Sequence, residues 1–348
     1  MEDEIKNAES DSRVVRVENI LEQYPSNHDD EEFLLNPCFG DPEMRGVLGG
    51  GYLTEEAFVK PKDFVHFSDR NYSFQKAGPR LRLAMKPENI IVAISLGGAL
   101  CPGLNSAIRE LVMSLWFNYG VRKVWGIKFG FVGILDENNW IELNPSKVTN
   151  IHTMGGAILG THRGSKLEAE KVVDKLLEKG VNVFIKIAGF GTFHQMLQLK
   201  KAIDSKKLGI ITACLPKTLD NDIPLIDRSF GFETTVEEIV KMISSAKLEA
   251  KTTPNSIAIV KAFGRQAGFT ALAATNSSRD VNICLIPEKK FNLYGEYGLI
   301  EFVFKRLAKK GSCVILVSEG VALSMYDKKL CNENEKDSFG NKLYPDIF

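Results

Sequence analysis

The sequence predicts an α/β protein built on parallel sheets, and three observations support this fold class. Several short runs are apolar throughout, as in strands buried on both faces, and the first is Ile90–Leu96. Runs whose apolar residues have helical spacing lie between them, such as Leu104–Phe117. Glycine-rich or polar segments stand where the apolar runs end. Buried strands that alternate with helices in this way form parallel sheets covered by helices.

The same alternation continues toward the C-terminus. Helices are expected at 165–179, 193–205, 234–250, 269–275 and 298–308, and further strands at 123–127, 181–187, 208–215, 256–262, 281–287 and 313–318. Residues 1–85 are polar and broken by Pro and Gly, so we expect an extended arm with one short helix at Val14–Gln23. The length of 348 residues favours two further domains, which we place at 86–225 and 226–348.

Composition excludes several classes of function. Lys and Arg number 44, as do Asp and Glu, so the net charge is zero, and no basic patch marks a nucleic-acid or membrane-surface protein. No apolar run approaches the roughly 18 residues of a membrane helix. The six cysteines include no CxxC pair, which favours reduced thiols, and the acidic start resembles no targeting peptide. We therefore expect a cytoplasmic protein.

Ligands of parallel sheets bind at the loops that leave the carboxyl ends of the strands. Segment 97–105, GGALCPGLN, places Gly98 where a ligand can approach the backbone, directly before a helix. Segment 155–164, GGAILGTHRG, adds Arg163, whose planar fork suits phosphate, and His162, which we expect to be a solvated loop residue. Segment 186–192, KIAGFGT, has the form of a phosphate loop but carries Phe190 in its middle. Each segment is also compatible with a tight turn that binds nothing.

The segment 216–224, PKTLDNDIP, is the richest in chemistry. Asp220 and Asp222 stand two residues apart, so in extended geometry both carboxylates point to one side. One can take a proton from an attacking hydroxyl, and the other can orient a divalent metal. Lys217 adds a positive charge near a transferring group. An Asp-rich turn held by local hydrogen bonds is the alternative interpretation.

Two further strand ends carry polar residues: AFGRQAG, with Gly264 and Arg265, and CLIPE, which ends in Glu288. Together these motifs and their order, CPGLNSAIRE, GGAILGTHRG, PKTLDNDIPLIDRSFGFETTVEE, FGRQAGF and CLIPE, resemble the phosphofructokinases, most closely the plant-type ATP-dependent 6-phosphofructokinases. The resemblance extends from about residue 60 to the end. It implies two Rossmann-like domains, 86–225 for the nucleotide and 226–348 for the sugar phosphate.

What the resemblance implies for activity is transfer of a phosphoryl group from ATP, with Mg²⁺, to the 1-hydroxyl of fructose 6-phosphate in glycolysis. Asp220 would be the general base, Thr218 would contact the sugar at its accepting end, and Asp222 and Lys217 would support the transferring group. The residues implied for the sugar are Phe263, Gly264, Arg265 and Glu288, and those for ATP are Gly98, Arg163, Gly164, Gly189, Gly191 and Thr192. An oligomer, often a tetramer, and allosteric control are typical of the family.

Three features depart from the family pattern. Phe190 stands where the family has a metal-binding aspartate, which leaves Asp222 as the one metal candidate. Ala99 stands where the family has glycine, and its methyl group would crowd the nucleotide phosphates. The chain ends at GNKLYPDIF, before a segment that grips the sugar phosphate in the family, so we expect the second domain to be incomplete.

These departures leave alternatives open. A member that binds metabolites or serves as a regulatory subunit without catalysis is one, because Phe190 offers no oxygen to a metal. A pyrophosphate-dependent phosphofructokinase is another, although Gly191 matches the small residue of ATP users. An unrelated dinucleotide-binding protein is disfavoured, because the first strand-to-helix turn lacks GxGxxG spacing.

Overall fold

A computed structural model describes residues 85–162, 167–223, 226 and 228–321, and the backbone of short strands closer to the N-terminus. Of Phe190 only the backbone is described. The chain divides into two compact units, residues 1–91 with 110–124 and residues 92–109 with 125–348. The domain boundaries expected at residues 85 and 225 stay a prediction.

Antiparallel strands make up the described part of the N-terminal arm. Strands β1 (Val15–Arg16), β4 (Tyr72–Gln75) and β3 (Phe64–His66) form one sheet in the order β1-β4-β3, and β2 (Leu34–Leu35) pairs with β5 (Arg82–Leu83). The expected helix at 14–23 is wrong at Val15 and Arg16, because their backbone pairs with β4 and pairing with a distant segment overrides local propensity. The rest of that helix lies outside the described residues.

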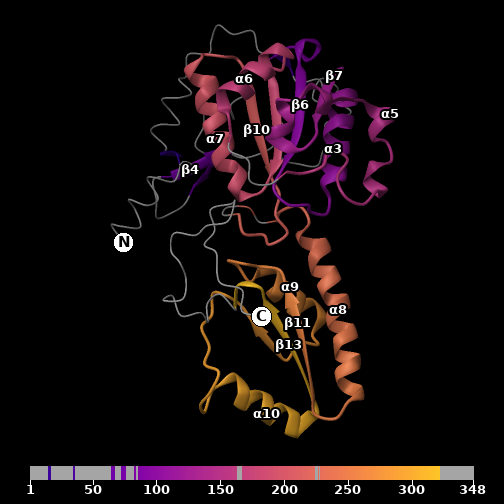
Figure 1. The fold of residues 1–348 in the computed structure, drawn as a ribbon, viewed down its shortest axis with the longest axis vertical. Helices are drawn as coiled ribbons and strands as arrows, with labels where there is room; N and C mark the ends of the chain where they lie inside the picture. Colours follow the sequence, from indigo (N-terminus) through magenta and orange to yellow (C-terminus); the bar gives the residue numbers. More distant parts are fainter. Residues whose placement is uncertain are drawn as a thin grey trace. The chain divides into compact units, whose positions relative to one another are not determined.

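A five-stranded sheet has the order β10-β9-β6-β7-β8, from Ile211–Pro216, Val183–Ala188, Ile91–Gly97, Lys123–Ile127 and Trp140–Leu143 (Figure 1). Strands β6, β9 and β10 pair in parallel, with Ser95 opposite Lys186 and Lys186 opposite Cys214. β6 and β9 are buried along almost their whole length, and each carries one polar side chain among apolar ones, Ser95 in β6 and Lys186 in β9. The predicted fold class, α/β with parallel sheets, is confirmed.

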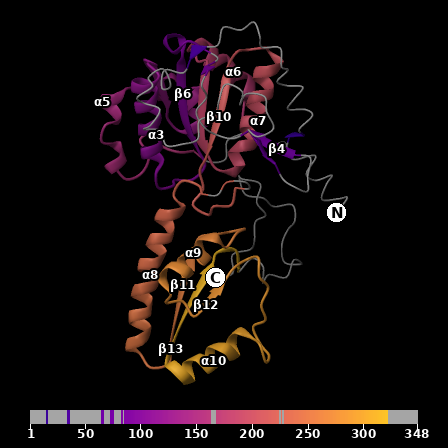
Figure 2. The same cartoon turned by 180° about the vertical axis from the view of Figure 1, so that it is seen from behind.

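The helices around this sheet begin close to where the sequence places them. They are α3 (Leu104–Met113), which continues as a π-helical turn at Ser114–Asn118, α6 (Ala169–Glu178) and α7 (Phe190–Ser205). Helices α6 and α7 pack together, beside the β10 end of the sheet in both views (Figures 1 and 2). Periodicity did not reveal the short elements α4 (Gly130–Ile134), β8 and α5 (Pro145–Val148), which are too brief to show a period.

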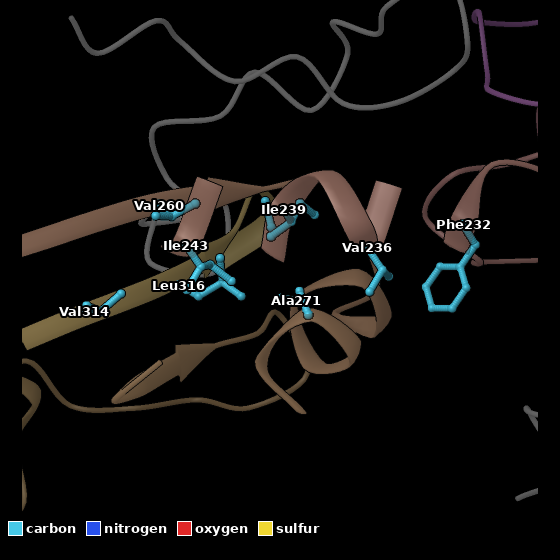
Figure 3. Close-up of a cluster of buried hydrophobic side chains, with 10 residues drawn as sticks. Phe232, Val236, Ile239, Ile243, Val260, Ala271, Val314 and Leu316 are labelled. Carbon is cyan, nitrogen blue, oxygen red and sulfur yellow. The ribbon is translucent and has the colours of Figure 1, made fainter. Parts of the chain in front are cut away.

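A second, three-stranded parallel sheet has the order β11-β13-β12, from Ser256–Ala262, Ser312–Ser318 and Ile283–Leu285. Its helices are α8 (Phe232–Thr252), α9 (Phe269–Ser278) and α10 (Leu299–Lys310). A core between α8, α9 and the sheet is shown in Figure 3. Ile243 and Leu316 belong to this core and are fully buried. The core residues are Phe232, Val236, Ile239, Ile243, Val260, Ala262, Ala271, Ala274, Val314 and Leu316.

Two general expectations can be compared with the described residues. Cys101, Cys214, Cys284 and Cys313 are free thiols, as predicted, whereas Cys38 and Cys331 lie outside the described residues. A search of the same part of the chain finds no helix with the length and apolarity that crossing a membrane demands.

Candidate active site

Glycine turns at the ends of β6 and β9 meet Lys217 directly after β10. Gly98 has φ +81°, a conformation that favours glycine. A Cβ built on Gly98 would lie 3.4 Å from Lys217 Nζ and 3.9 Å from the Gly189 backbone nitrogen. Three of the predicted site residues are therefore neighbours, as expected at the carboxyl edge of adjacent parallel strands.

Lys217 is almost fully buried, with 4% of its surface exposed. Its Nζ donates a hydrogen bond to the carbonyl oxygen of Ala99, and its backbone forms a parallel bridge with Phe230. The side chain is thus fixed under the first glycine turn and does not extend freely into solvent. The backbone carbonyl group of Ala99 therefore helps to fix the position of the Lys217 ammonium group.

The segment KIAGFGT enters its helix sooner than the sequence suggested. Gly189 is extended and α7 begins at Phe190, so most of the predicted 189–194 loop is the first turn of the helix. The Thr192 N–H in that turn donates to the Gly189 carbonyl oxygen at 3.0 Å, and the N–H groups of Phe190 and Gly191 stand at the start of a helix, a position that favours an anion. Gly191 is exposed, and a Cβ built on it would meet nothing within 4 Å, so packing within the described residues does not demand a glycine there.

Thr192 and Gly97 are in tight contact below this turn. Thr192 is buried, and a Cβ on Gly97 would lie 3.0 Å from its Oγ1 and 3.1 Å from Lys186 Cε. Gly97 is therefore required by packing inside the protein. Its φ lies outside the left-handed region, in contrast to that of Gly98.

The segment TLDND is organised by the side chain of Thr218. Thr218 Oγ1 donates to Asp222 Oδ1 at 2.8 Å and accepts a hydrogen bond from the Asp220 backbone N–H at 3.1 Å. Asn221, at φ +55°, accepts from the Ser229 backbone N–H through Oδ1 at 2.9 Å. These bonds are those of an Asp-rich turn. They leave Asp220 Oδ1 without a partner among the described residues, while the Asp220 carboxyl forms a hydrogen bond with the backbone of Arg265.

Asp220 carries the clearest chemical signal in the site. Its Oδ1 is buried and has no hydrogen-bond partner among the described residues. Burial raises the pKa of the Asp220 carboxyl to about 6, and the neighbouring charge of Asp222 adds to the rise. A buried carboxyl oxygen that lacks a partner is rare in folded proteins and is suited to accept a proton from a bound hydroxyl.

The strand ends of the three-stranded sheet gather the other predicted residues. Gly264, at φ +117°, could not carry a side chain, because its Cβ would lie 2.2 Å from the Ala267 carbonyl oxygen. Ser318 Oγ donates to the Gly264 carbonyl oxygen at 2.6 Å. Glu288 Oε1 accepts from the Gly268 backbone N–H at 2.8 Å. The Phe263–Arg265 turn and Glu288 are thus anchored at the ends of β11 and β12, and the Phe263 side chain is half exposed.

Other predicted residues are less informative. Arg163 and Gly164 lie outside the described residues, and His162 is exposed, as expected for a solvated loop histidine. Within the described residues, no group of three or more His, Cys, Asp or Glu side chains could hold a metal ion. Asp222 is the nearest approach to a metal ligand, and one of its oxygens already accepts from Thr218.

Sequence reasoning missed Lys186 as an individual residue. It lies in the middle of β9 and is fully buried, with Nζ donating to Ser95 Oγ at 2.9 Å. A lysine between apolar neighbours in VFIKIA is the signal that could have identified it, because lysine is almost never fully buried without a partner.

The chain resembles known proteins over most of its length. Residues 91–343 match the family described as Phosphofructokinase, so the chain belongs to the phosphofructokinase family. It is 40% identical over 334 residues to ATP-dependent 6-phosphofructokinase 1 of Arabidopsis thaliana. The matched segment covers 94% of this chain and 70% of that protein. It is 39% identical over 328 residues to ATP-dependent 6-phosphofructokinase of Borreliella burgdorferi, covering 88% of this chain and 72% of that protein.

Solved structures agree on the fold. Phosphofructokinase from Saccharomyces cerevisiae matches with a TM-score of 0.58 at 22% identity, over 67% of this chain and 33% of that chain. A pyrophosphate-dependent phosphofructokinase from Marinobacter aquaeolei gives the same TM-score and identity, over 67% of this chain and 61% of that chain. The chain therefore spans from about a third to about six tenths of these solved chains.

Proposed function

We propose that this chain is an ATP-dependent 6-phosphofructokinase, which transfers the γ-phosphoryl group of ATP to the 1-hydroxyl of fructose 6-phosphate. The single observation that supports it most is Asp220, whose buried Oδ1 lacks a partner in the described residues and whose pKa is raised to about 6. The names of the relatives, ATP-dependent 6-phosphofructokinases, supply the substrate and the donor.

In the reaction, Asp220 accepts the proton of the sugar hydroxyl as its oxygen attacks the γ-phosphorus. The bond from that phosphorus to the bridging oxygen breaks, and ADP leaves with the electron pair. A raised pKa suits the task, because the carboxyl is ionised at neutral pH and is still a stronger base than an ordinary aspartate. Thr218 holds Asp222 and the Asp220 backbone in place by its two hydrogen bonds.

The donor end of the site is assigned to the glycine turns and α7. Gly98, Gly189 and Gly191 would receive the ATP phosphates on backbone N–H groups, and Lys217 would offset the charge that develops as the phosphoryl group moves. Thr192 is assigned to ATP by family resemblance, because its backbone N–H donates to the Gly189 carbonyl oxygen at 3.0 Å. Arg163 and Gly164 are assigned to the nucleotide by family resemblance alone. The residues assigned to the sugar phosphate are Phe263, Gly264, Arg265 and Glu288, which lie at strand ends.

Magnesium fits this site as an ion that ATP carries. Mg²⁺ keeps most of its waters and needs only one or two carboxylates in addition to phosphate oxygens. Asp222 would supply one carboxylate, and Phe190 supplies none. When bound, the ion would neutralise phosphate charge. The absence of a carboxylate at position 190 leads us to propose that turnover is slow relative to that of a chain with aspartate there.

We also propose a cellular compartment and an oligomeric state for this chain. A cytoplasmic protein is expected, where its free thiols stay reduced. A homo- or hetero-oligomer is expected from the family, and a regulatory subunit is the second candidate function, favoured by Phe190. Co-purification with a full-length relative whose kinetics then change would support the regulatory role.

The test is a donor comparison with purified protein. Fructose 1,6-bisphosphate is measured with fructose 6-phosphate and Mg²⁺, in the presence of ATP or of pyrophosphate. We expect product with ATP and a background rate with pyrophosphate. Product with pyrophosphate alone would establish the pyrophosphate-dependent alternative, and no product with either donor would reject catalysis.

A further inference from the structure

Lys186 is the group that the proposed reaction leaves unexplained. Its whole side chain is buried in β9, between Ser95 on β6 and Cys214 on β10. Its Nζ donates to Ser95 Oγ at 2.9 Å and lies 3.9 Å from the centroid of the Phe131 ring. No carboxylate of the described residues forms an ion pair with it. Burying an unpaired ammonium group raises the free energy of the folded protein, unless a negative charge comes near it.

The side chain runs toward the edge where the phosphates are expected. A Cβ on Gly97 would lie 3.1 Å from Lys186 Cε, and a Cβ on Gly130 would lie 3.6 Å from Lys186 Nζ. Thr192, in the first turn of α7, borders the same Gly97. Lys186 is therefore directly beneath the glycine turn of β6 and beside the start of α7, yet it is sealed from direct contact with a ligand.

The groups around it do not supply the missing negative charge. Burial raises the pKa of the Cys214 thiol to about 12, so this neighbour from β10 is neutral. The hydroxyl groups of Ser95 and Thr192 come from β6 and α7, and the ring of Phe131 comes from α4. His162 places its Cβ 3.7 Å from the position of a Cβ on Gly130, and its ring carries no negative charge. Burial lowers the pKa of the Lys186 ammonium to about 7, with Cys214 as a minor opposing influence.

We propose that Lys186 determines the affinity of the phosphate-donor site, as a buried ammonium that gains its counter-charge only when a polyphosphate occupies the turns above it. Binding of ATP then favours the protonated lysine and takes up a proton. The effect acts through space, so Lys186 is an affinity-determining residue and not a catalytic one. This inference rests on the proposed function only in placing the ATP phosphates at the turns of Gly98 and Gly189.

The experiment measures ATP binding without sugar by isothermal titration calorimetry at pH 7.5, in buffers with different ionisation heats. Wild type, Lys186→Met and the exposed-surface control Lys251→Met are compared. If a bound phosphate raises the pKa of Lys186 by one unit, wild type takes up about half a proton more per ATP than Lys186→Met. The relative affinity of wild type should also gain about sixfold between pH 8.5 and pH 6.5. Lys251→Met should match wild type, because Lys251 is exposed in the last turn of α8.

The outcomes separate this inference from the proposed function. Equal proton uptake and equal pH dependence in wild type and Lys186→Met, with ATP bound by both, would overturn the role of Lys186 and leave the donor site intact. Failure of all three proteins to bind ATP would overturn both. If Lys186→Met does not fold, ¹³C-NMR of the lysine ε-carbons in wild type replaces it, and a buried lysine whose pKa does not rise with ATP would contradict the inference.

Discussion

The turns after β9 and β10 follow neighbouring parallel strands but differ in the charged side chains that they carry. After β10, Asp220 and Asp222 are organised by Thr218, and one carboxyl oxygen is left free to accept a proton. After β9 there is no carboxylate, since Phe190 begins α7, and the strand carries the buried Lys186. Under the proposed function, the end assigned to the sugar hydroxyl keeps its carboxylates, whereas the end assigned to the phosphates has no acid at position 190 and would depend on positive charge.

The largest expected effect tests the β10 turn. Asp220→Asn removes the base and keeps the shape of the side chain, so we expect kcat for fructose 1,6-bisphosphate to fall about a thousandfold. Thermal unfolding should change little, since Oδ1 has no partner to lose among the described residues and the asparagine side-chain oxygen can still accept the hydrogen bond of the Arg265 backbone. A fall of less than about tenfold would show that another group accepts the proton, and would contradict the assignment of hydroxyl activation to the turn after β10.

A change at the β9 turn should act in the opposite direction. Phe190→Asp supplies an oxygen ligand near the phosphates, so we expect the Mg²⁺-dependent rate to rise about ten- to a hundredfold. Phe190→Ala is the matched control, because it removes the ring without adding a charge. If alanine raises the rate as much as aspartate does, bulk and not metal binding limits this turn.

The pH profile sharpens the assignment of Asp220. Because the general base must be ionised, kcat/KM should fall about tenfold per pH unit below the Asp220 pKa of about 6. The nearby charge of Asp222 contributes to that raised pKa, so Asp222→Asn should shift the acid limb to lower pH. Rates of wild type and variant are measured from pH 5 to pH 8. An acid limb that stays in place in Asp222→Asn would contradict the coupling.

The smallest expected effect concerns stability near β9. Lys186 has a folded pKa of about 7, below that of an unfolded lysine. The unfolded chain therefore binds more protons between about pH 7 and pH 10, and the free energy of unfolding should rise with pH across this window. Lys186→Met removes the penalty and should be more stable by about 1 to 4 kcal/mol at pH 7. Denaturant unfolding at pH 7.5 and pH 9.5 checks the pH dependence of wild type and the stability gain of Lys186→Met. A variant less stable than wild type at pH 7.5 would show that interactions in the folded protein offset the cost of burying Lys186.

The sequence was sufficient for the parallel strands, because runs such as Ile91–Gly97 are apolar apart from Ser95, as is typical of strands buried on both faces. It was also sufficient to bring Gly98, Gly189 and Lys217 to one edge of the sheet. The sequence could not show that the Thr218 hydroxyl forms hydrogen bonds within its own turn. It also could not show that the side chains of Lys186 and Thr192 leave no room for a side chain at Gly97. Those facts depend on side-chain packing between strands that are distant in the chain, and strand periodicity does not encode it.

The central claim is that the intact turn after β10 activates the sugar hydroxyl for attack on ATP. The most direct measurement follows ATP, ADP and the sugar phosphates by ³¹P-NMR in one reaction of wild type with fructose 6-phosphate and MgATP, beside Asp220→Asn. We predict that wild type forms ADP and fructose 1,6-bisphosphate in equal amounts while Asp220→Asn leaves both substrates nearly unchanged. Formation of ADP without the bisphosphate, or equal product from both proteins, would contradict the account.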